Sequence, residues 1–119
     1  MTILIVEDNP NIRRLIRRAA SEVADAIFEC EDGADSLAAY TAHRPDLVLM
    51  DVRMPRMDGL SATRNLLTQY PDAKVIIVTD YNDEELHSAA REAGACGYAL
   101  KHNLTELDAV LLEAYGRSS

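Results

Sequence analysis

Five short runs of apolar, largely β-branched residues alternate along this chain with longer segments of helical periodicity. We expect the runs to be strands, at residues 2–6, 26–30, 46–50, 74–79 and 96–100. A strand that is apolar at successive positions must be covered on both faces, and helical crossovers supply that cover in parallel sheets. The alternation therefore predicts an α/β fold, a doubly wound parallel sheet of five strands between two layers of helices.

Local signals mark where the helices between these strands begin and end. Asn9-Pro10 is a favourable N-cap followed by proline at the first helical position. Asn82 and Asn103 each precede a glutamate by three residues, which is the spacing of a capping box, and Gly94 is a typical helix terminator. The first helix is expected to bury the apolar residues that recur at helical spacing, namely Ile12, Leu15, Ile16, Ala19 and Val23.

The length of the chain and the distribution of its apolar and acidic residues argue against a second domain, a membrane span and a secretory leader. A chain of 119 residues fits one domain, which we take as residues 1–119, with 116–119 as the expected start of a linker. No apolar run reaches the ~20 residues needed to cross a bilayer. Acidic residues directly after the first apolar run argue against a secretory leader. We therefore expect a cytoplasmic protein that does not bind membranes.

Charge and cysteine usage narrow the function further. The formal net charge is −8, and so acidic a surface is repelled by nucleic-acid phosphates, which argues against direct nucleic-acid binding. Cys30 and Cys96 lack metal-ligand spacing and are expected to be buried, reduced thiols. His43, His87 and His102 show no ligand spacing either and are expected at the surface.

Residues with reactive side chains stand at the ends of four predicted strands. Glu7 and Asp8 follow the first, Asp51 follows the third, Thr79 ends the fourth and Lys101 follows the fifth. Taken singly, each is an ordinary turn, cap or strand residue. Together they share the carboxyl edge of the sheet, where doubly wound folds bind their ligands. Because clustered carboxylates repel one another unless a cation binds them, the pattern predicts a Mg²⁺ pocket that contains a candidate nucleophile.

Four segments resemble the receiver domain of two-component response regulators, namely VEDN, LVLMDVRMPRMDG, VIIVTDY and GACGYALK. The resemblance covers essentially the whole chain, with the segments in the same order and spacing. It implies a flavodoxin-like three-layer sandwich with five helices and the strand order 2-1-3-4-5, which the pattern alone leaves as one of two common orders.

The resemblance also implies a role for each residue of the pocket. Asp51 is the expected phosphoacceptor, which attacks the phosphohistidine of a sensor histidine kinase or phosphotransfer protein, or a small acyl phosphate. Lys101 and Thr79 are expected to contact the phosphoryl oxygens. The expected Mg²⁺ ligands are Glu7 (largely through water), Asp8, Asp51 and the backbone carbonyl of Arg53.

Signalling in such domains depends on a conformational switch. By resemblance, Thr79 moves toward the phosphoryl group and Tyr98 turns into the space that it leaves. The domain would then control transcription through a partner or through a DNA-binding output domain, which we expect to be absent from this chain. It would catalyse only its own phosphorylation and dephosphorylation. Met54-Pro55 and Asp58-Gly59 match the loop after the phosphoacceptor, where Gly59 is expected to permit a tight turn.

Three further features qualify this interpretation. Asp80 stands where a small residue is usual, and we expect it to slow phosphorylation by small donors. His102 stands where many receivers have proline, and the peptide before it is expected to be trans. The first helix carries a basic stripe that comprises Arg13, Arg14, Arg17 and Arg18. This stripe is either a solvated face or a docking site for an acidic kinase surface. This helix and the face near Tyr98 are candidate homodimer surfaces.

Three other functions remain as alternatives. A receiver-like interaction module that is never phosphorylated is favoured only by Asp80. A phosphatase of the haloacid dehalogenase type would need an aspartate two residues after the nucleophile, where this chain has Arg53. A flavodoxin-like FMN carrier would need a phosphate-binding first loop, for which Glu7 and Asp8 have the wrong charge.

Overall fold

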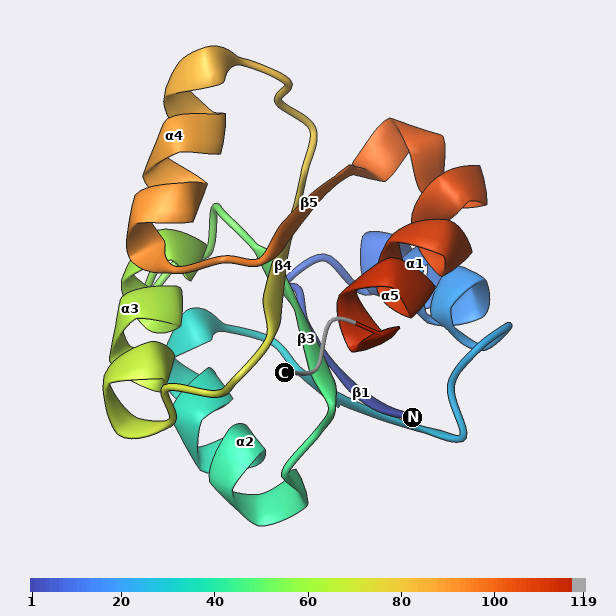
Figure 1. The fold of residues 1–119 in the computed structure, drawn as a ribbon, viewed down its shortest axis with the longest axis horizontal. Coiled ribbons are helices and arrows are strands. Elements are labelled where there is room, and N and C mark those ends of the chain that lie inside the picture. The colour runs from blue at the N-terminus through green and yellow to red at the C-terminus, as the bar shows by residue number, and fades with distance from the viewer. Residues whose placement is uncertain (117–119) are drawn as a thin grey trace.

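The structure is a computed structural model that describes residues 1–116. Its strands are β1 (Thr2–Val6), β2 (Ala26–Cys30), β3 (Leu47–Asp51), β4 (Val75–Thr79) and β5 (Gly97–Leu100). Its helices are α1 (Pro10–Ala20), α2 (Ser36–His43), α3 (Gly59–Gln69), α4 (Glu84–Ala93) and α5 (Leu107–Gly116), with 3₁₀ segments at Gly33–Asp35 and Lys101–Glu106 (Figure 1). The predicted order of elements is confirmed, with each strand boundary within one residue of its expected place. Residues 117–119 of the expected linker lie outside the described residues.

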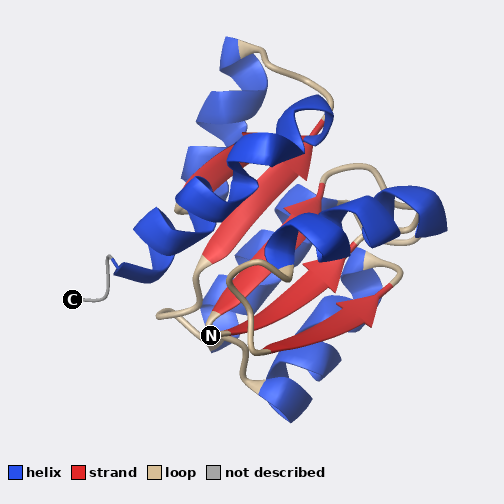
Figure 2. Ribbon diagram, turned by 90° about the vertical axis from the view of Figure 1, so that its right-hand side faces the viewer, coloured by secondary structure: helices blue, strands red, loops and turns tan. Residues whose placement is uncertain are grey.

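All five strands belong to one parallel sheet, in the order β2-β1-β3-β4-β5. This is the order that the resemblance implied. The arrowheads in Figure 2 point to one edge of the sheet, so the loops that follow the strands gather there. The register places Asp51 beside Val78 and Thr79 beside Leu100, which brings the last residues of β3, β4 and β5 next to one another.

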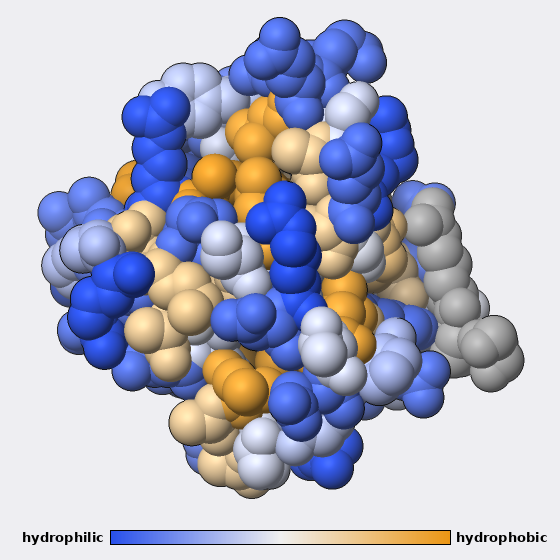
Figure 3. Space-filling model, turned by 90° about the vertical axis from the view of Figure 1, so that its left-hand side faces the viewer, coloured by the Kyte–Doolittle hydropathy of each residue, from blue (hydrophilic) through white to orange (hydrophobic). Residues whose placement is uncertain are grey.

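The helices form two layers, one on each face of the sheet. α1 and α5 cover one face, and α2, α3 and α4 cover the other (Figure 1). On the outer side of the second layer, hydrophilic residues surround a few apolar ones that are visible in hollows (Figure 3). Within residues 1–116, no helix combines the length and the hydropathy needed to span a membrane.

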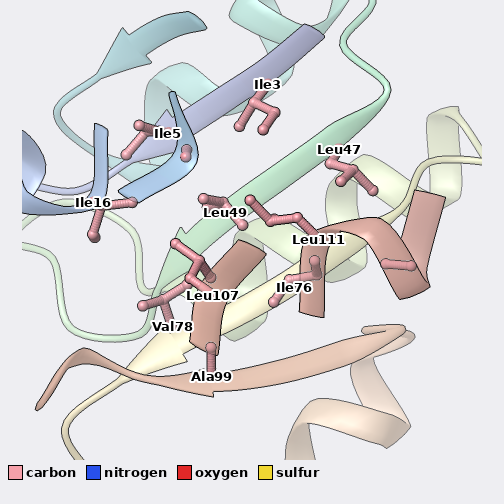
Figure 4. Packing of buried hydrophobic residues seen from close by; sticks show 12 residues of the cluster. Ile3, Ile5, Ile16, Leu47, Leu49, Ile76, Val78, Ala99, Leu107 and Leu111 are labelled. Carbon is pink, nitrogen blue, oxygen red and sulfur yellow. The ribbon is translucent and has the colours of Figure 1, made fainter. Parts of the chain in front are cut away.

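Successive side chains of a strand point to opposite faces of the sheet, so the hydrophobic core consists of two clusters, one under each layer of helices. Ile3 and Ile5 pack toward α1 and α5, whereas Leu4 and Val6 belong to the cluster under α2, α3 and α4. Figure 4 shows the first cluster, in which side chains of β1, β3 and β4 meet Leu107 of α5 and its neighbours. Each such side chain, fully buried, contributes about 1.5–3 kcal/mol relative to an exposed one. This packing holds the strand ends in place.

Helix starts agree with the sequence in one case and differ in two. Asn9 caps α1 as predicted, accepting hydrogen bonds from two backbone N–H groups of the first turn. α4 is capped by Asp83 rather than Asn82, because the backbone is extended at Asp83 and its side chain accepts from the N–H three residues later. At Asn103 the backbone is non-helical inside a 3₁₀ segment, so the α-helix begins only at Leu107.

Burial of three side chains also departs from expectation. Leu15 is 51% exposed, because the buried face of α1 is centred on Ile16 and Ala20 and leaves Leu15 at its rim. Cys30 and Cys96 are each half-buried, whereas we expected both to be fully buried.

Candidate functional site

Four strand ends deliver the predicted reactive residues to one place. Glu7 follows β1, Asp51 ends β3, Thr79 ends β4 and Lys101 follows β5. Glu7 is 1% exposed, Asp51 5% and Thr79 2%, although all three are polar. Polar side chains with so little access to water must find partners inside the protein, or bind a ligand.

The three carboxylates converge as the sequence predicted. Glu7, Asp8 and Asp51 each offer an oxygen, and these oxygens all lie within 4.8 Å of one another. Glu7 and Asp51 are buried, whereas Asp8 is exposed. Oxygen ligands in this number, open to water on one side, have the chemistry that Mg²⁺ requires. The residues present therefore fit a hard divalent cation.

Lys101 lies between two of these acids. Its Nζ is 2.8 Å from Glu7 Oε1 and 2.9 Å from Asp51 Oδ1, and its side chain is 10% exposed. One ammonium therefore pairs with two of the three carboxyl groups, so the ionised group carries an excess of negative charge. This is the sign of charge that a cation would offset.

The pKa values of the group follow from this arrangement. Burial raises the pKa of Glu7 to about 7, although hydrogen bonds from Lys101 and from the Asn9 N–H oppose the rise. Burial also raises the pKa of Asp51, against the opposing effect of Lys101. Burial would lower the pKa of Lys101, but its two carboxylate partners raise it overall. The two carboxylate partners thus favour the charged ammonium, while burial disfavours the ionised forms of Glu7 and Asp51, which a bound cation would favour.

The backbone around Asp51 is held by Gly59. The Gly59 N–H donates to the Val52 carbonyl at 2.7 Å, and the Val52 N–H donates to Asp51 Oδ1 at 2.8 Å. A Cβ at Gly59 would lie 1.8 Å from the carbonyl oxygen of Asp51. The glycine is therefore required by this close approach. The expected tight turn is not the reason, because Gly59 has no positive φ.

Asp32 is a supporting residue whose role the sequence did not reveal. Its carboxylate is buried and accepts hydrogen bonds from the backbone N–H groups of Ala34, Arg56 and Met57, at 2.9, 2.9 and 3.0 Å. The last two belong to the loop between β3 and α3, so Asp32 ties that loop to the end of β2. The residues near Asp32 in the sequence do not indicate this role, since Arg56 and Met57 are more than twenty residues away.

The expected switch residues are linked through Tyr81. The Tyr81 N–H donates to Thr79 Oγ1 at 3.3 Å, and the Tyr81 carbonyl accepts from the Tyr98 hydroxyl. Tyr98 is stacked on His87 of α4, with ring centroids 3.7 Å apart. His87 is therefore half-buried, whereas we expected it at the surface. The end of β4 is thus connected by contacts to the face formed by α4 and β5.

Arg53 and Asp80 extend from the loops that follow β3 and β4. The Arg53 guanidinium lies 4.7 Å from the centroid of the Tyr81 ring. Asp80 is exposed and is not a member of the carboxylate group described above. The peptide before His102 is trans, as predicted.

The basic stripe of α1 is partly engaged within the molecule. Arg13 and Arg17 both bind the carboxylate of Glu29, and Arg13 also donates to the backbone carbonyl of Glu7 at 2.8 Å. Arg14 and Arg18 are exposed. Glu29 of β2 therefore engages two arginines of the stripe, of which only Arg13 also contacts the backbone after β1, and the other two arginines face outward.

Comparison with known proteins agrees with this geometry. Residues 3–111 match the model of the response regulator receiver domain. The chain is 35% identical over 115 residues to the transcriptional regulatory protein DegU of Brevibacillus brevis, an alignment that covers 94% of this chain and 47% of DegU. The chain thus spans about half the length of the curated relatives it matches.

Solved structures support the same relationship. A two-component response regulator of the LuxR family from Aurantimonas sp. SI85-9A1 has a TM-score of 0.90 at 28% identity, over 97% of this chain and 84% of that one. The receiver domain of NtrX from Brucella abortus has a TM-score of 0.89 at 27% identity, over 98% of this chain and 99% of that one.

Proposed function

The chain belongs to the response regulator receiver domain family, and from this premise we propose that it accepts a phosphoryl group on Asp51 with the help of Mg²⁺. The donor is the phosphohistidine of a sensor histidine kinase or phosphotransfer protein, or a small acyl phosphate. One observation carries the proposal: a charged lysine and three carboxylates meet around the end of β3, although they come from distant parts of the sequence.

Each step of the proposed reaction uses a group already in position. An Asp51 carboxylate oxygen forms a bond to phosphorus as the bond between phosphorus and the donor atom breaks. Lys101 provides positive charge to the transferred oxygens, and the Thr79 hydroxyl donates a hydrogen bond to them. When bound by Glu7, Asp8, Asp51 and the Arg53 carbonyl, Mg²⁺ supplies further positive charge.

The proposed output is a change of conformation rather than a chemical product. Phosphorylation would pull the Thr79 hydroxyl away from the Tyr81 N–H, and Tyr81 in turn holds the Tyr98 hydroxyl. A modification can shift an equilibrium only through contacts that differ between two states, and these are the contacts that we expect to differ. We propose that the shift controls transcription through an output domain or partner, and that the domain acts on no other substrate.

Encounter with the donor protein is assigned to α1. Arg14 and Arg18 are exposed on α1, the helix that leads away from the carboxyl edge, and can attract an acidic surface over a Debye length of about 10 Å at 0.1 M salt. Reversing both charges to glutamate should slow phosphotransfer from the kinase at low salt and leave phosphorylation by acetyl phosphate unchanged. Equal rates of transfer from the kinase before and after reversal would remove α1 from the proposal.

Intact mass spectrometry tests the central claim. Incubation with acetyl phosphate and Mg²⁺ should add one phosphate to the parent chain and none to Asp51→Asn. Asp72→Asn is the matched control, because Asp72 is an exposed aspartate in the loop that precedes β4, and it should be labelled like the parent. An unlabelled parent would favour an interaction module that is never phosphorylated, and a labelled Asp51→Asn would assign the acceptor elsewhere.

A further inference from the structure

We propose that Arg13 of α1 is a positioning residue for the metal pocket, because its guanidinium holds the peptide that joins Glu7 to Asp8. The contact thereby directs the Asp8 carboxylate toward Asp51. The inference rests on the proposed function and deepens it, since it names a residue that supports Mg²⁺ binding without being a ligand. Arg13 lies outside the carboxylate group and outside the Lys101 ion pairs.

The contact comes from the first turns of α1. Side chains of a helix lean toward its N-terminus, so Arg13 can reach the loop that precedes the helix. Its Nη1 donates to the backbone carbonyl of Glu7 at 2.8 Å. Its side chain is only 16% exposed, although arginine is usually a surface residue. The guanidinium is thus fixed against the segment that leads from β1 to α1.

A second partner, Glu29 of β2, holds the same guanidinium. Arg13 Nε donates to Glu29 Oε1 at 2.8 Å, while Nη1 binds the Glu7 carbonyl. One planar guanidinium can make both contacts at once, because its donors lie in a fixed fork. A single rigid group therefore joins α1, β2 and the residue that follows β1.

The peptide between Glu7 and Asp8 is the unit that this fork holds. A peptide is planar, so a hydrogen bond to its carbonyl oxygen also orients the Cα that follows. The Glu7 N–H donates to the Cys30 carbonyl at 3.2 Å, beyond the last paired residues of β1 and β2. Glu7 is therefore held through both of its backbone groups, which sets the direction in which the chain leaves the sheet at Asp8.

Asp8 depends on this backbone more than the other two acids do. Glu7 and Asp51 are buried and form ion pairs with Lys101, whereas Asp8 is exposed. An oxygen of Asp8 nevertheless lies within 4.8 Å of oxygens of both other acids. Packing does not impose that place on an exposed side chain, so the preceding peptide must. Loosening the peptide should let Asp8 turn toward solvent and should weaken metal binding.

Charge and position predict opposite effects for the loss of Arg13. A guanidinium near the pocket repels a divalent cation, so its loss would tighten Mg²⁺ binding if charge alone mattered. Loss of the positioning contact should instead weaken binding by about tenfold, the lower end of the range for residues that orient metal ligands. The sign of the change in Kd therefore separates the two roles.

The experiment measures urea unfolding of each variant at pH 8, with and without Mg²⁺. The increase in the free energy of unfolding on addition of Mg²⁺ gives the Kd of the folded protein, whatever its stability without metal. Arg13→Met keeps an aliphatic side chain and removes the fork, so its Kd should be about tenfold higher than that of the parent.

Two further variants make the test specific. Arg17→Met is the matched control, since Arg17 also binds Glu29, whereas the Glu7 carbonyl is bound by Arg13. Its Kd should equal that of the parent or be lower. Arg13→Lys keeps the charge but cannot span Glu29 and the Glu7 carbonyl with one planar group, so its Kd should rise.

Failure of the positioning role and failure of the proposed function give different results. A Kd for Arg13→Met at or below the parental value would overturn the role of Arg13, even if this variant were less stable without metal. A parental Kd in Arg13→Lys, or an equal rise in Arg17→Met, would overturn it too. A parent that Mg²⁺ does not stabilise would overturn the proposed metal pocket itself.

Discussion

Glu7 should make the affinity for Mg²⁺ depend on pH. Its carboxyl is 1% exposed, and burial raises its pKa to about 7, above the ordinary value of 4.5. A proton and a divalent cation compete for the same carboxylate oxygens, so metal binding requires the ionised form. The affinity should therefore rise as the pH increases through 7.

The magnitude follows directly from this pKa. About a tenth of Glu7 is ionised at pH 6 and about nine-tenths at pH 8. If only the ionised form binds, the apparent Kd for Mg²⁺ should fall about tenfold between these two pH values. Burial raises the pKa of Asp51 as well, so its titration can only steepen this dependence.

Stability provides a second measurement with a definite sign. The folded-state pKa of Glu7 is raised, so the stability that the bound proton contributes is complete below about pH 4.5 and is lost as the pH rises through about 7. Without metal, the free energy of unfolding should decrease over this window. Addition of Mg²⁺ should restore it above pH 7, where the carboxylate is free to bind the ion.

Isothermal titration calorimetry at pH 6, 7 and 8 is the assay, since the chain contains no tryptophan to report binding by fluorescence. Glu7→Gln should bind more weakly and with a flatter pH dependence. A Kd for the parent that is equal at pH 6 and pH 8, or tighter at pH 6, would refute the reasoning. Persistence of the full tenfold dependence in Glu7→Gln would show that another group titrates.

Two further predictions concern the residues that support the site. Gly59→Ala should lower the free energy of unfolding, measured by urea titration, by about 1–3 kcal/mol. It should also reduce phosphorylation, since its Cβ would meet the Asp51 carbonyl at 1.8 Å. Gly116→Ala is the control and should be neutral or stabilising in the same titration, because nothing lies within 4 Å of its Cβ. Burial would raise the pKa of Asp32, yet three backbone N–H donors hold this pKa below its ordinary value. The stability that the ionised carboxylate contributes is therefore present above about pH 4. It is lost as the pH falls through the lower pKa of the folded state. Asp32→Asn should therefore lower the free energy of unfolding by about 1–3 kcal/mol at pH 7 and by less at pH 3, measured by urea unfolding. An equal loss at both pH values would contradict a stabilising role for the ionised carboxylate.

Local signals explain why so much of the fold could be predicted. The β-branched runs, the Asn9 cap and the terminating glycine at Gly94 depend on residues within one turn of each other, and all three were confirmed. The strand order required the family resemblance, because alternation alone is compatible with more than one arrangement. The prediction at Asn82 was wrong because the adjacent Asp83 competes for the same cap. The prediction at Asn103 was wrong because a 3₁₀ segment precedes the α-helix there.

Contacts between distant segments were beyond such reasoning. Nothing near Asp32 in the sequence indicates that its partners are Arg56 and Met57, and nothing near Tyr81 points to Arg53. Gly59 was noted as a loop residue, but its close approach to Asp51 exists only after α3 packs beside β3. These residues shape the loops around the site and do not supply its reactive groups.

The amino-acid sequence by itself determined which reactive groups the protein has and that parallel strands would carry them to one edge. Only the tertiary structure decided that the ammonium of Lys101 bridges two buried acids, that Glu7 retains a proton near neutrality, and that Asp51 is screened from water. The physical reason is that charge and solvation depend on distances across the sheet, and those distances are set by packing.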